Sequence, residues 1–409
     1  MKDDKKLELL LERFYQRYNK YNTKVLEKMG ETIKKFDGIS PSLAHQVAQE
    51  LKYGADLDDL TAELSELSGK SIKDIETAFD LVARENVAFA EVYAKAKNKE
   101  FVDYKDNKEL QSLVKGIAGE TNGMFVNVSN SNAVGFTMVE NGQKVFKPLK
   151  QTYYDLIDEA VFNVEIGVTD YQSAMRNVIK QLAASGVKIH EEKVGYKSGY
   201  NVRIDSAVRQ NVLDGIRKIN VNIQEQVGKE FGANAIELSL TFPCADDHAP
   251  YEGKIYTHKE FENIQSSLDR PFFQWNCRHF GFQVVKGISQ PQYTQKYLDQ
   301  KHAQEHEEFY FEGKKINQVE ANDLMRKIET SIRRNKDAQI IGKSAGNKEI
   351  VANSQQNITA LTHKYNELSK VSNLPTYKNR LVVSGYRRVN PNKLQKWNRF
   401  GIIYLSICG

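Results

Sequence analysis

The stretch IDSAVRQNVLDGIRKINVNIQEQVGKEF, residues 204–231, decides the fold class. Apolar side chains recur in it at three- and four-residue spacing, which is the period of one face of an α-helix. They are Val208, Val212, Ile216, Ile219 and Ile223. Gly232 follows directly, and glycine is typical of the residue that ends a helix. We expect a long helix here whose apolar face lies in a core.

The same period recurs on both sides of this helix. The segments that show it are residues 7–15, 43–51, 72–89, 153–182, 324–332 and 358–368. Ser40 before Pro41 and the lone Ser71 are predicted to cap two of these helices, because a serine hydroxyl can accept from the first backbone amides. Asn317 with Glu320 is typical of a capping box. Helices therefore dominate the chain.

Between residues 116 and 150 the pattern predicts strands. Phe125–Val128 alternates, and residues 136–139 and 144–146 flank Asn141-Gly142, a common hairpin turn pair. The predicted fold class is α+β, predominantly α-helical. We expect a helical N-terminal module (1–115), short strands plus long helices (116–235), a compact Cys/His loop module (236–300), a basic helical-hairpin tail (301–390) and an extension (391–409).

The composition excludes several classes of protein. The chain has 409 residues, 40% hydrophobic and 27% charged, which is typical of a globular protein of several units and not of a disordered or collagenous one. No run of eighteen apolar residues occurs and the start has no secretory signal, so we expect a soluble protein made in a cytosol. Three cysteines are too few for a disulfide framework.

The net charge of +5 is unevenly distributed. Residues 301–409 hold 19 Lys and Arg against 10 Asp and Glu, a net charge of +9, which leaves −4 for residues 1–300. A local basic excess favours a polyanion or an acidic protein surface as partner. The alternative is a solvated helix face.

Two short groups pair a cysteine with a histidine: Cys244 with His248, and Cys277 with His279. Thiolate and imidazole are the ligands of tetrahedral zinc sites, and two such pairs joined by a loop commonly build one. These four residues are the candidate zinc ligands. The alternative is that both cysteines are small buried hydrophobes and both histidines are hydrogen-bonded loop residues.

One enzymatic reading uses the same segment. His248, Asn276 and His279 loosely follow the His-Asn-His pattern of metal-dependent nucleases, in which a histidine activates water. No nucleophile elbow, phosphate-binding glycine loop or dinucleotide fingerprint is present in the sequence. Gly342-Lys343-Ser344 lacks the upstream glycine of a P-loop and is better explained as a break between helices.

These motifs, in their order along the chain, resemble a known family. They are Asp247-His248-Ala249-Pro250, Gly253-Lys254-Ile255-Tyr256, the box Trp275-Asn276-Cys277-Arg278-His279, and Gly287-Ile288-Ser289. The chain resembles the phage minor capsid protein 2 family over roughly residues 5–390. It departs from the family pattern where Thr241 replaces a histidine and Tyr251-Glu252 replaces Trp-Gln. If the family's histidines and cysteine bind a metal, Cys244 is placed to replace the ligand missing at Thr241.

The resemblance implies a structural protein and not an enzyme. It implies a minor head protein at the portal vertex of a tailed bacteriophage, made in the bacterial cytoplasm and located in the virion. The implied partners are the portal protein, other head proteins and packaged double-stranded DNA, with a part in DNA ejection and without a membrane. Candidate DNA or acidic-partner contacts are Arg326, Lys327, Arg333, Arg334, Arg387 and Arg388.

Two other functions stay open. One is a metal-dependent nuclease or processing enzyme that uses His248 and His279. The other is a nucleic-acid-binding protein that is never built into particles.

Overall fold

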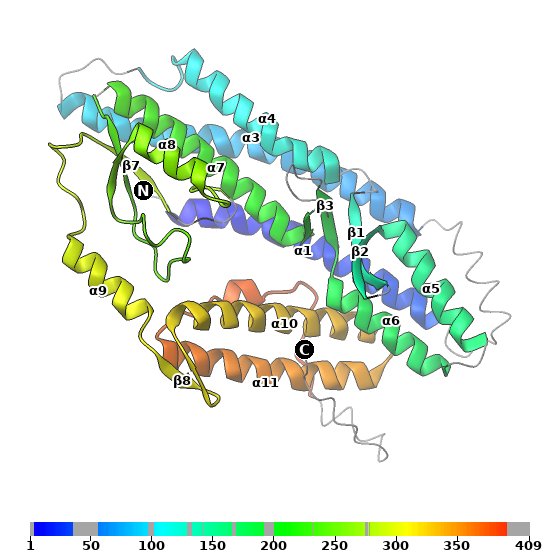
Figure 1. Cartoon of the computed structure of the whole chain (residues 1–409). Coiled ribbons are helices and arrows are strands. Elements are labelled where there is room, and N and C mark those ends of the chain that lie inside the picture. The colour runs from blue at the N-terminus through cyan, green and yellow to red at the C-terminus, as the bar shows by residue number, and fades with distance from the viewer. Residues whose placement is uncertain are drawn as a thin grey trace.

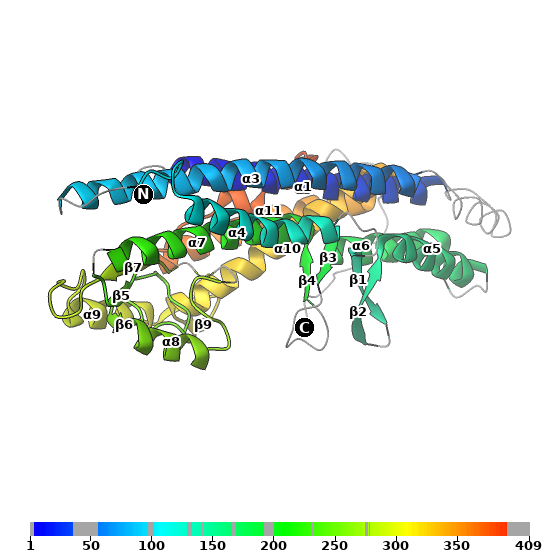
Figure 2. The same ribbon diagram turned by 90° about the horizontal axis from the view of Figure 1, so that it is seen from above.

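The computed structural model describes residues 4–35, 56–96, 102–128, 133–140, 142–165, 169–191, 200–230, 232–274, 277 and 279–390. Its shape is elongated, and long helices run along its length (Figures 1 and 2). The helices that contribute to the largest core are α1 (Asp4–Lys35), α3 (Asp56–Ala96), α4 (Lys108–Val128), α5 (Leu149–Glu165), α6 (Tyr171–Ser185) and α7 (Ile204–Glu230), together with parts of α10 (Gln318–Ser344) and α11 (Lys348–Ser372). Among the described residues, none of the helices is both long and apolar enough to cross a membrane.

Helix α7 is the long helix that the sequence predicts over residues 204–231, and it lies at the centre of the core. Its predicted apolar face is buried and contacts α1, α3 and α4. Gly215 lets these helices approach closely, because a Cβ there would lie 2.4 Å from the Phe79 ring of α3 and 2.5 Å from the Thr121 hydroxyl of α4. Gly232 follows the helix with a φ of 78°, as expected for a residue that ends it.

A four-stranded antiparallel sheet lies beside α5 and α6, with the order β2-β1-β3-β4. Its strands are β1 (Val134–Glu140), β2 (Gln143–Pro148), β3 (Lys188–Glu191) and β4 (Tyr200–Arg203). Strands β1 and β2 form the predicted hairpin, with Thr137 opposite Phe146. Asp170 caps α6 by accepting from the Ser173 amide.

The segment after α7 forms a smaller unit around a three-stranded sheet of order β6-β5-β7. Its elements are β5 (Ala235–Leu238), β6 (Ile255–Thr257), α8 (His258–Ser267) and β7 (Gly281–Val284), followed by α9 (Gln295–Glu305). Ile236, Leu238, Phe272, Phe273 and Cys277 form its separate core. This unit is the predicted Cys/His loop module. The next hairpin, β8 (Phe309–Phe311) and β9 (Lys314–Ile316), packs against the tail, where Phe311 joins the core of α10 and α11.

The tail is a helical hairpin, as predicted. Helices α10 and α11 pack along each other (Figure 1) and a short 3₁₀ helix, η1 (Lys378–Leu381), follows. Asn317 and Glu320 form the predicted capping box of α10. One end of the hairpin has its own core, whereas Ile340, Ile341 and Ile350 at the other end join the core around α7.

A buried ionic network fixes the tail to the body. Arg203 at the end of β4 donates to Asp337 of α10 and lies 3.4 Å from Asp205 of α7. Asn22 of α1 donates to Asp337 over 3.4 Å and Asn19 to Asp205 over 3.1 Å. Although burial opposes the charged form, the arginines around Asp205 hold the pKa of its carboxyl below the usual value. The tail and the body also share apolar packing, because the largest core contains residues of the predicted segments 1–115, 116–235 and 301–390.

Two local predictions are wrong. Ser71 does not begin a helix but lies buried inside α3, where its hydroxyl donates to the Leu67 carbonyl over 2.8 Å and accepts from Tyr18 and Arg17 of α1. Such i−4 bonding satisfies a serine inside a helix. Residues 125–128 are the last turn of α4 and not a strand. Four alternating residues are too short a window to separate the two periods, and the buried face of α4 already begins at Leu110.

Two further predictions lie outside the described residues. These are the helix expected after Ser40 and the extension 391–409.

Candidate metal centre

The strand order brings both Cys/His loops to one end of the small sheet. Strand β5 is antiparallel to β6 and to β7, so the chain leaves the sheet at Leu238 beside the point where it re-enters at Ile255 and at Gly281. The first loop, residues 239–254, carries Cys244 and His248. The second, which precedes β7, carries Cys277 and His279. The two pairs meet because of this topology, although about thirty residues separate them along the chain.

Three of the four predicted ligands converge. The Cys277 Sγ lies 3.3 Å from the His279 Nδ1 and 3.7 Å from the His248 Nδ1, and the three donor atoms lie within 4.8 Å of one another. All three side chains are buried. The Phe272 ring stacks on His248, with centroids 4.1 Å apart, and meets His279 edge-on at 5.0 Å. The donors therefore face one another at a buried site packed against an aromatic ring.

The outer nitrogen of each histidine has a fixed partner. The His248 Nε2 lies 2.8 Å from the Arg270 carbonyl oxygen, to which it donates, and the His279 Nε2 lies 3.0 Å from the Glu252 Oε2. In a neutral imidazole this leaves the Nδ1 lone pair free, and it points at Cys277. Histidine ligands of metals are held in this way, by a carbonyl or a carboxylate on the other nitrogen. The donor set fits a zinc ion.

Cys244 lies on the other side of the His279 ring. Its Sγ is 3.7 Å from the His279 Nε2, and it forms a second group of possible ligands with Glu252 and His279. Within the described residues, the four predicted ligands thus fall into two groups that share His279, the second completed by Glu252, and not into one tetrahedral set. Cys244 is held in place by its backbone amide, which donates to the Glu305 Oε1 over 3.0 Å.

The two cysteines differ in protonation. Burial alone would raise the pKa of the Cys277 thiol, but hydrogen bonds with His248 and His279 lower it to about 5. Burial and the nearby Glu252 carboxylate raise the pKa of Cys244 above its usual value. Burial lowers the pKa of His279, but the contacts with Cys277 and Glu252 outweigh it and raise this pKa to about 8. Cys277 is therefore a thiolate paired with a protonated His279 at neutral pH, and a metal ion would take the place of the proton on the His279 Nδ1.

The arrangement also has the order of a thiol–imidazole–carboxylate triad, Cys277–His279–Glu252. A nucleophile must reach its substrate, and Cys277 is only 4% exposed. His248, one of the two histidines of the nuclease interpretation, is 2% exposed, and its Nε2 donates to a backbone carbonyl. Metal coordination is the chemistry that buried donors of this kind carry out best. Trp275, Asn276 and Arg278 of the box lie outside the described residues.

Sequence reasoning missed three residues of the site. Glu252 bonds both the Thr241 amide and His279 through its Oε2, and His302 and Glu305 of α9 lie next to it. The spacing His302-x-x-Glu305 places both side chains on one helix face, and this was the available signal. Glu252 gave none of its own, since one glutamate in a loop is ordinary.

The six basic candidates for DNA or acidic-partner contacts differ in exposure. Arg326, Lys327 and Arg334 of α10 are exposed, as are Arg387 and Arg388 after η1. Arg333 is half-buried, and its Nη1 lies 3.3 Å from the Ser206 hydroxyl beside Asp205. Arg333 therefore lies next to the buried ionic network of Arg203, Asp205 and Asp337.

Comparison with known proteins gives one match. The model of the family described as "Phage minor capsid protein 2" matches residues 3–369. No curated protein matches the chain, and no solved structure does.

Proposed function

The chain belongs to the phage minor capsid protein 2 family, and on this premise we propose that it is a minor head protein that docks at the portal vertex of a tailed bacteriophage. The family gives it a structural role in the phage and a place in the virion. One observation carries the proposal: the family match covers nine-tenths of the chain, from α1 almost to the end of α11, so it includes the body, the candidate metal centre and the helical hairpin of the tail.

The tail is the surface that we assign to packaged DNA or to an acidic face of a partner. Lys343 of α10 donates to the Arg387 carbonyl over 3.0 Å, so the segment after η1 runs beside the C-terminal end of α10, whereas Arg326 and Lys327 lie in the N-terminal half of the helix. Exposed lysines and arginines bind phosphates through charge and without reading bases. The net charge of +9 in residues 301–409 supports this assignment.

Duplex-DNA binding of a charge-reversal variant tests the tail. The variant Arg326→Glu/Lys327→Glu is compared with Lys70→Glu/Lys73→Glu, which changes two exposed lysines of α3 by the same charge. Each phosphate contact contributes about 0.9 to the slope of log K against log salt concentration. We expect the tail variant to bind more weakly and its slope to fall by up to about 2. Equal affinities and slopes for the two variants would refute the assignment of this surface to DNA.

For the metal centre we propose a zinc ion held by His248, Cys277 and His279. The ion would link the two loops, which otherwise meet through a small apolar core. Zinc with protein ligands on both loops contributes to folding, because the unfolded chain has no preformed site. The role is structural: the module keeps its shape in the assembled head.

Mass spectrometry of purified particles tests the structural function. We expect the chain in mature virions or procapsids, in few copies. Its absence from both would favour the alternative of a nucleic-acid-binding protein that stays outside particles. Incubation of the pure protein with duplex DNA and divalent metals tests the nuclease alternative. Cleavage that His248→Gln abolishes would support that alternative, and uncut DNA would count against it.

A further inference from the structure

A third group of possible ligands lies at the other oxygen of Glu252, the one that does not bond His279. Donor atoms of Glu252, His302 and Glu305 lie within 4.8 Å of one another, and the His302 Nε2 is 3.6 Å from the Glu252 Oε1. Glu252 is 1% exposed and Glu305 is 2% exposed. Neither carboxylate lies where water can solvate it.

One oxygen of each carboxylate has no hydrogen-bond partner among the described residues. The Glu252 Oε2 accepts from the Thr241 amide and from His279, and the Glu305 Oε1 accepts from the Cys244 amide. The Glu252 Oε1 and the Glu305 Oε2 are both buried and unpartnered. A buried carboxylate oxygen without a donor is costly, and a bound cation removes this cost. Two such oxygens from different elements, together with one imidazole, indicate a cation.

Helix α9 has few other attachments to the module. Within α9, all of which is described, Leu298 and Glu305 are the buried residues. Leu298 packs over Gly253, where a Cβ would lie 2.5 Å from its Cδ2. An ion on His302 and Glu305 would join α9 to the loop 239–254 through Glu252. It would strengthen the attachment that the Glu305–Cys244 hydrogen bond already gives the C-terminal end of the helix.

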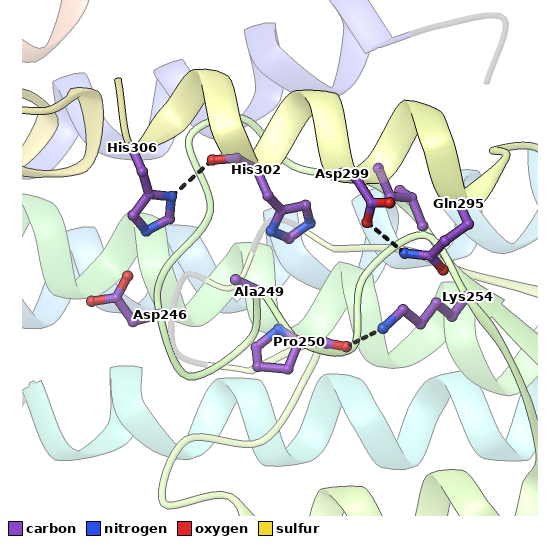
Figure 3. Close-up of a pocket in the computed structure, with 9 residues that line it drawn as sticks. Asp246, Ala249, Pro250, Lys254, Gln295, Asp299, His302 and His306 are labelled. Atoms are coloured by element: carbon purple, nitrogen blue, oxygen red, sulfur yellow. Dashed lines mark hydrogen bonds between the residues drawn. The ribbon is translucent and has the colours of Figure 1, made fainter. Parts of the chain in front are cut away.

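We propose that Glu252, His302 and Glu305 bind a second zinc ion, separate from the one at Cys277. Carboxylate and imidazole are zinc ligands, and three protein ligands leave a fourth position open. His302 also lines a cavity of about 420 Å³ between α9 and the loop of Ala249 and Pro250 (Figure 3). Of the three proposed ligands, His302 is the one that faces this cavity. This proposal rests on these side chains and not on the role in the phage head.

Metal analysis of the full-length protein after zinc loading and gel filtration tests the proposal. We expect about two zinc ions per chain in the wild-type protein and about one in His302→Ala and in Glu305→Gln. His302 is 29% exposed and Glu305→Gln keeps the acceptor for the Cys244 amide, so both variants should fold. Two controls should keep both ions: His363→Ala, an exposed histidine of α11, and Asp299→Asn, in the cavity wall.

The result also separates the two sites. One ion per chain that Cys277→Ser removes and His302→Ala does not would overturn the second site and leave the first. One ion that His302→Ala removes and Cys277→Ser does not would support the second site and overturn the first. A protein without zinc would overturn both, and none of these results bears on whether the chain is found in virions.

Discussion

Asp337→Ala should lower the free energy of unfolding by about 3 to 5 kcal/mol. Asp337 is fully buried on α10 and accepts from Arg203 of β4 and Asn22 of α1. Alanine leaves the Arg203 guanidinium buried, at 7% exposure, with Asp205 as its remaining carboxylate partner at 3.4 to 3.5 Å. A buried charge that loses its closest counter-charge strongly lowers the free energy of unfolding, and the remaining contact with Asp205 limits this decrease.

Urea unfolding followed by circular dichroism at 222 nm measures this loss. Asp74→Ala is the matched control, because Asp74 also pairs with an arginine, Arg17, but is 49% exposed and should lose at most about 1 kcal/mol. The double variant Arg203→Met/Asp337→Leu removes both charges and should lose less than the sum of its single variants. A loss for Asp337→Ala no larger than that of the control would refute the claim that this network fixes the tail to the body.

Three further results are expected. Cys277→Ser should abolish zinc binding at the Cys/His group, whereas Cys244→Ser should keep it; equal loss in both would contradict the division of the ligands. Burial and nearby arginines lower the pKa of Lys188 to about 8, so Lys188→Met should stabilise the fold by roughly 1 to 3 kcal/mol at pH 7. The unfolded lysine keeps its proton up to about pH 10.5, whereas the folded one loses it above about pH 8, so the wild-type protein becomes more stable above pH 8. The stability advantage of Lys188→Met over the wild-type protein, measured by urea unfolding, should therefore be smaller at pH 10 than at pH 7. An equal advantage at both pH values would refute this. Gly253→Ala, at a φ of 69° beneath Leu298, should speed amide exchange in α9, and unchanged exchange would contradict the contact.

The helical part of the fold could be predicted from the sequence because its signals are local and long. The apolar period of α7 extends from Val208 to Ile223 in a helix of 27 residues, and the capping box of α10 involves residues only three apart. The predictions for Ser71 and for residues 125–128 were wrong because a short stretch of sequence shows the residue types but not the neighbours that they contact in the fold. A buried serine that bonds one turn back and a serine that caps a helix look alike in the sequence.

The candidate site could be predicted in part. Cys277, His248 and His279 were found because cysteine and histidine are rare and occur in close pairs. That Cys244 lies across the His279 ring from Cys277 depends on how two loops leave one sheet, which spacing does not encode. The carboxylates at positions 252 and 305 and the imidazole of His302 meet through the placement of α9. Neither glutamate differs in the sequence from the many exposed ones.

Chemical cross-linking of intact phage heads, read by mass spectrometry, tests docking at the portal vertex. We expect this chain to be recovered from the heads and its lysines to cross-link to the portal protein. A chain that is present in heads but cross-links only to the major capsid lattice, or that is absent from heads, would contradict docking at the portal vertex.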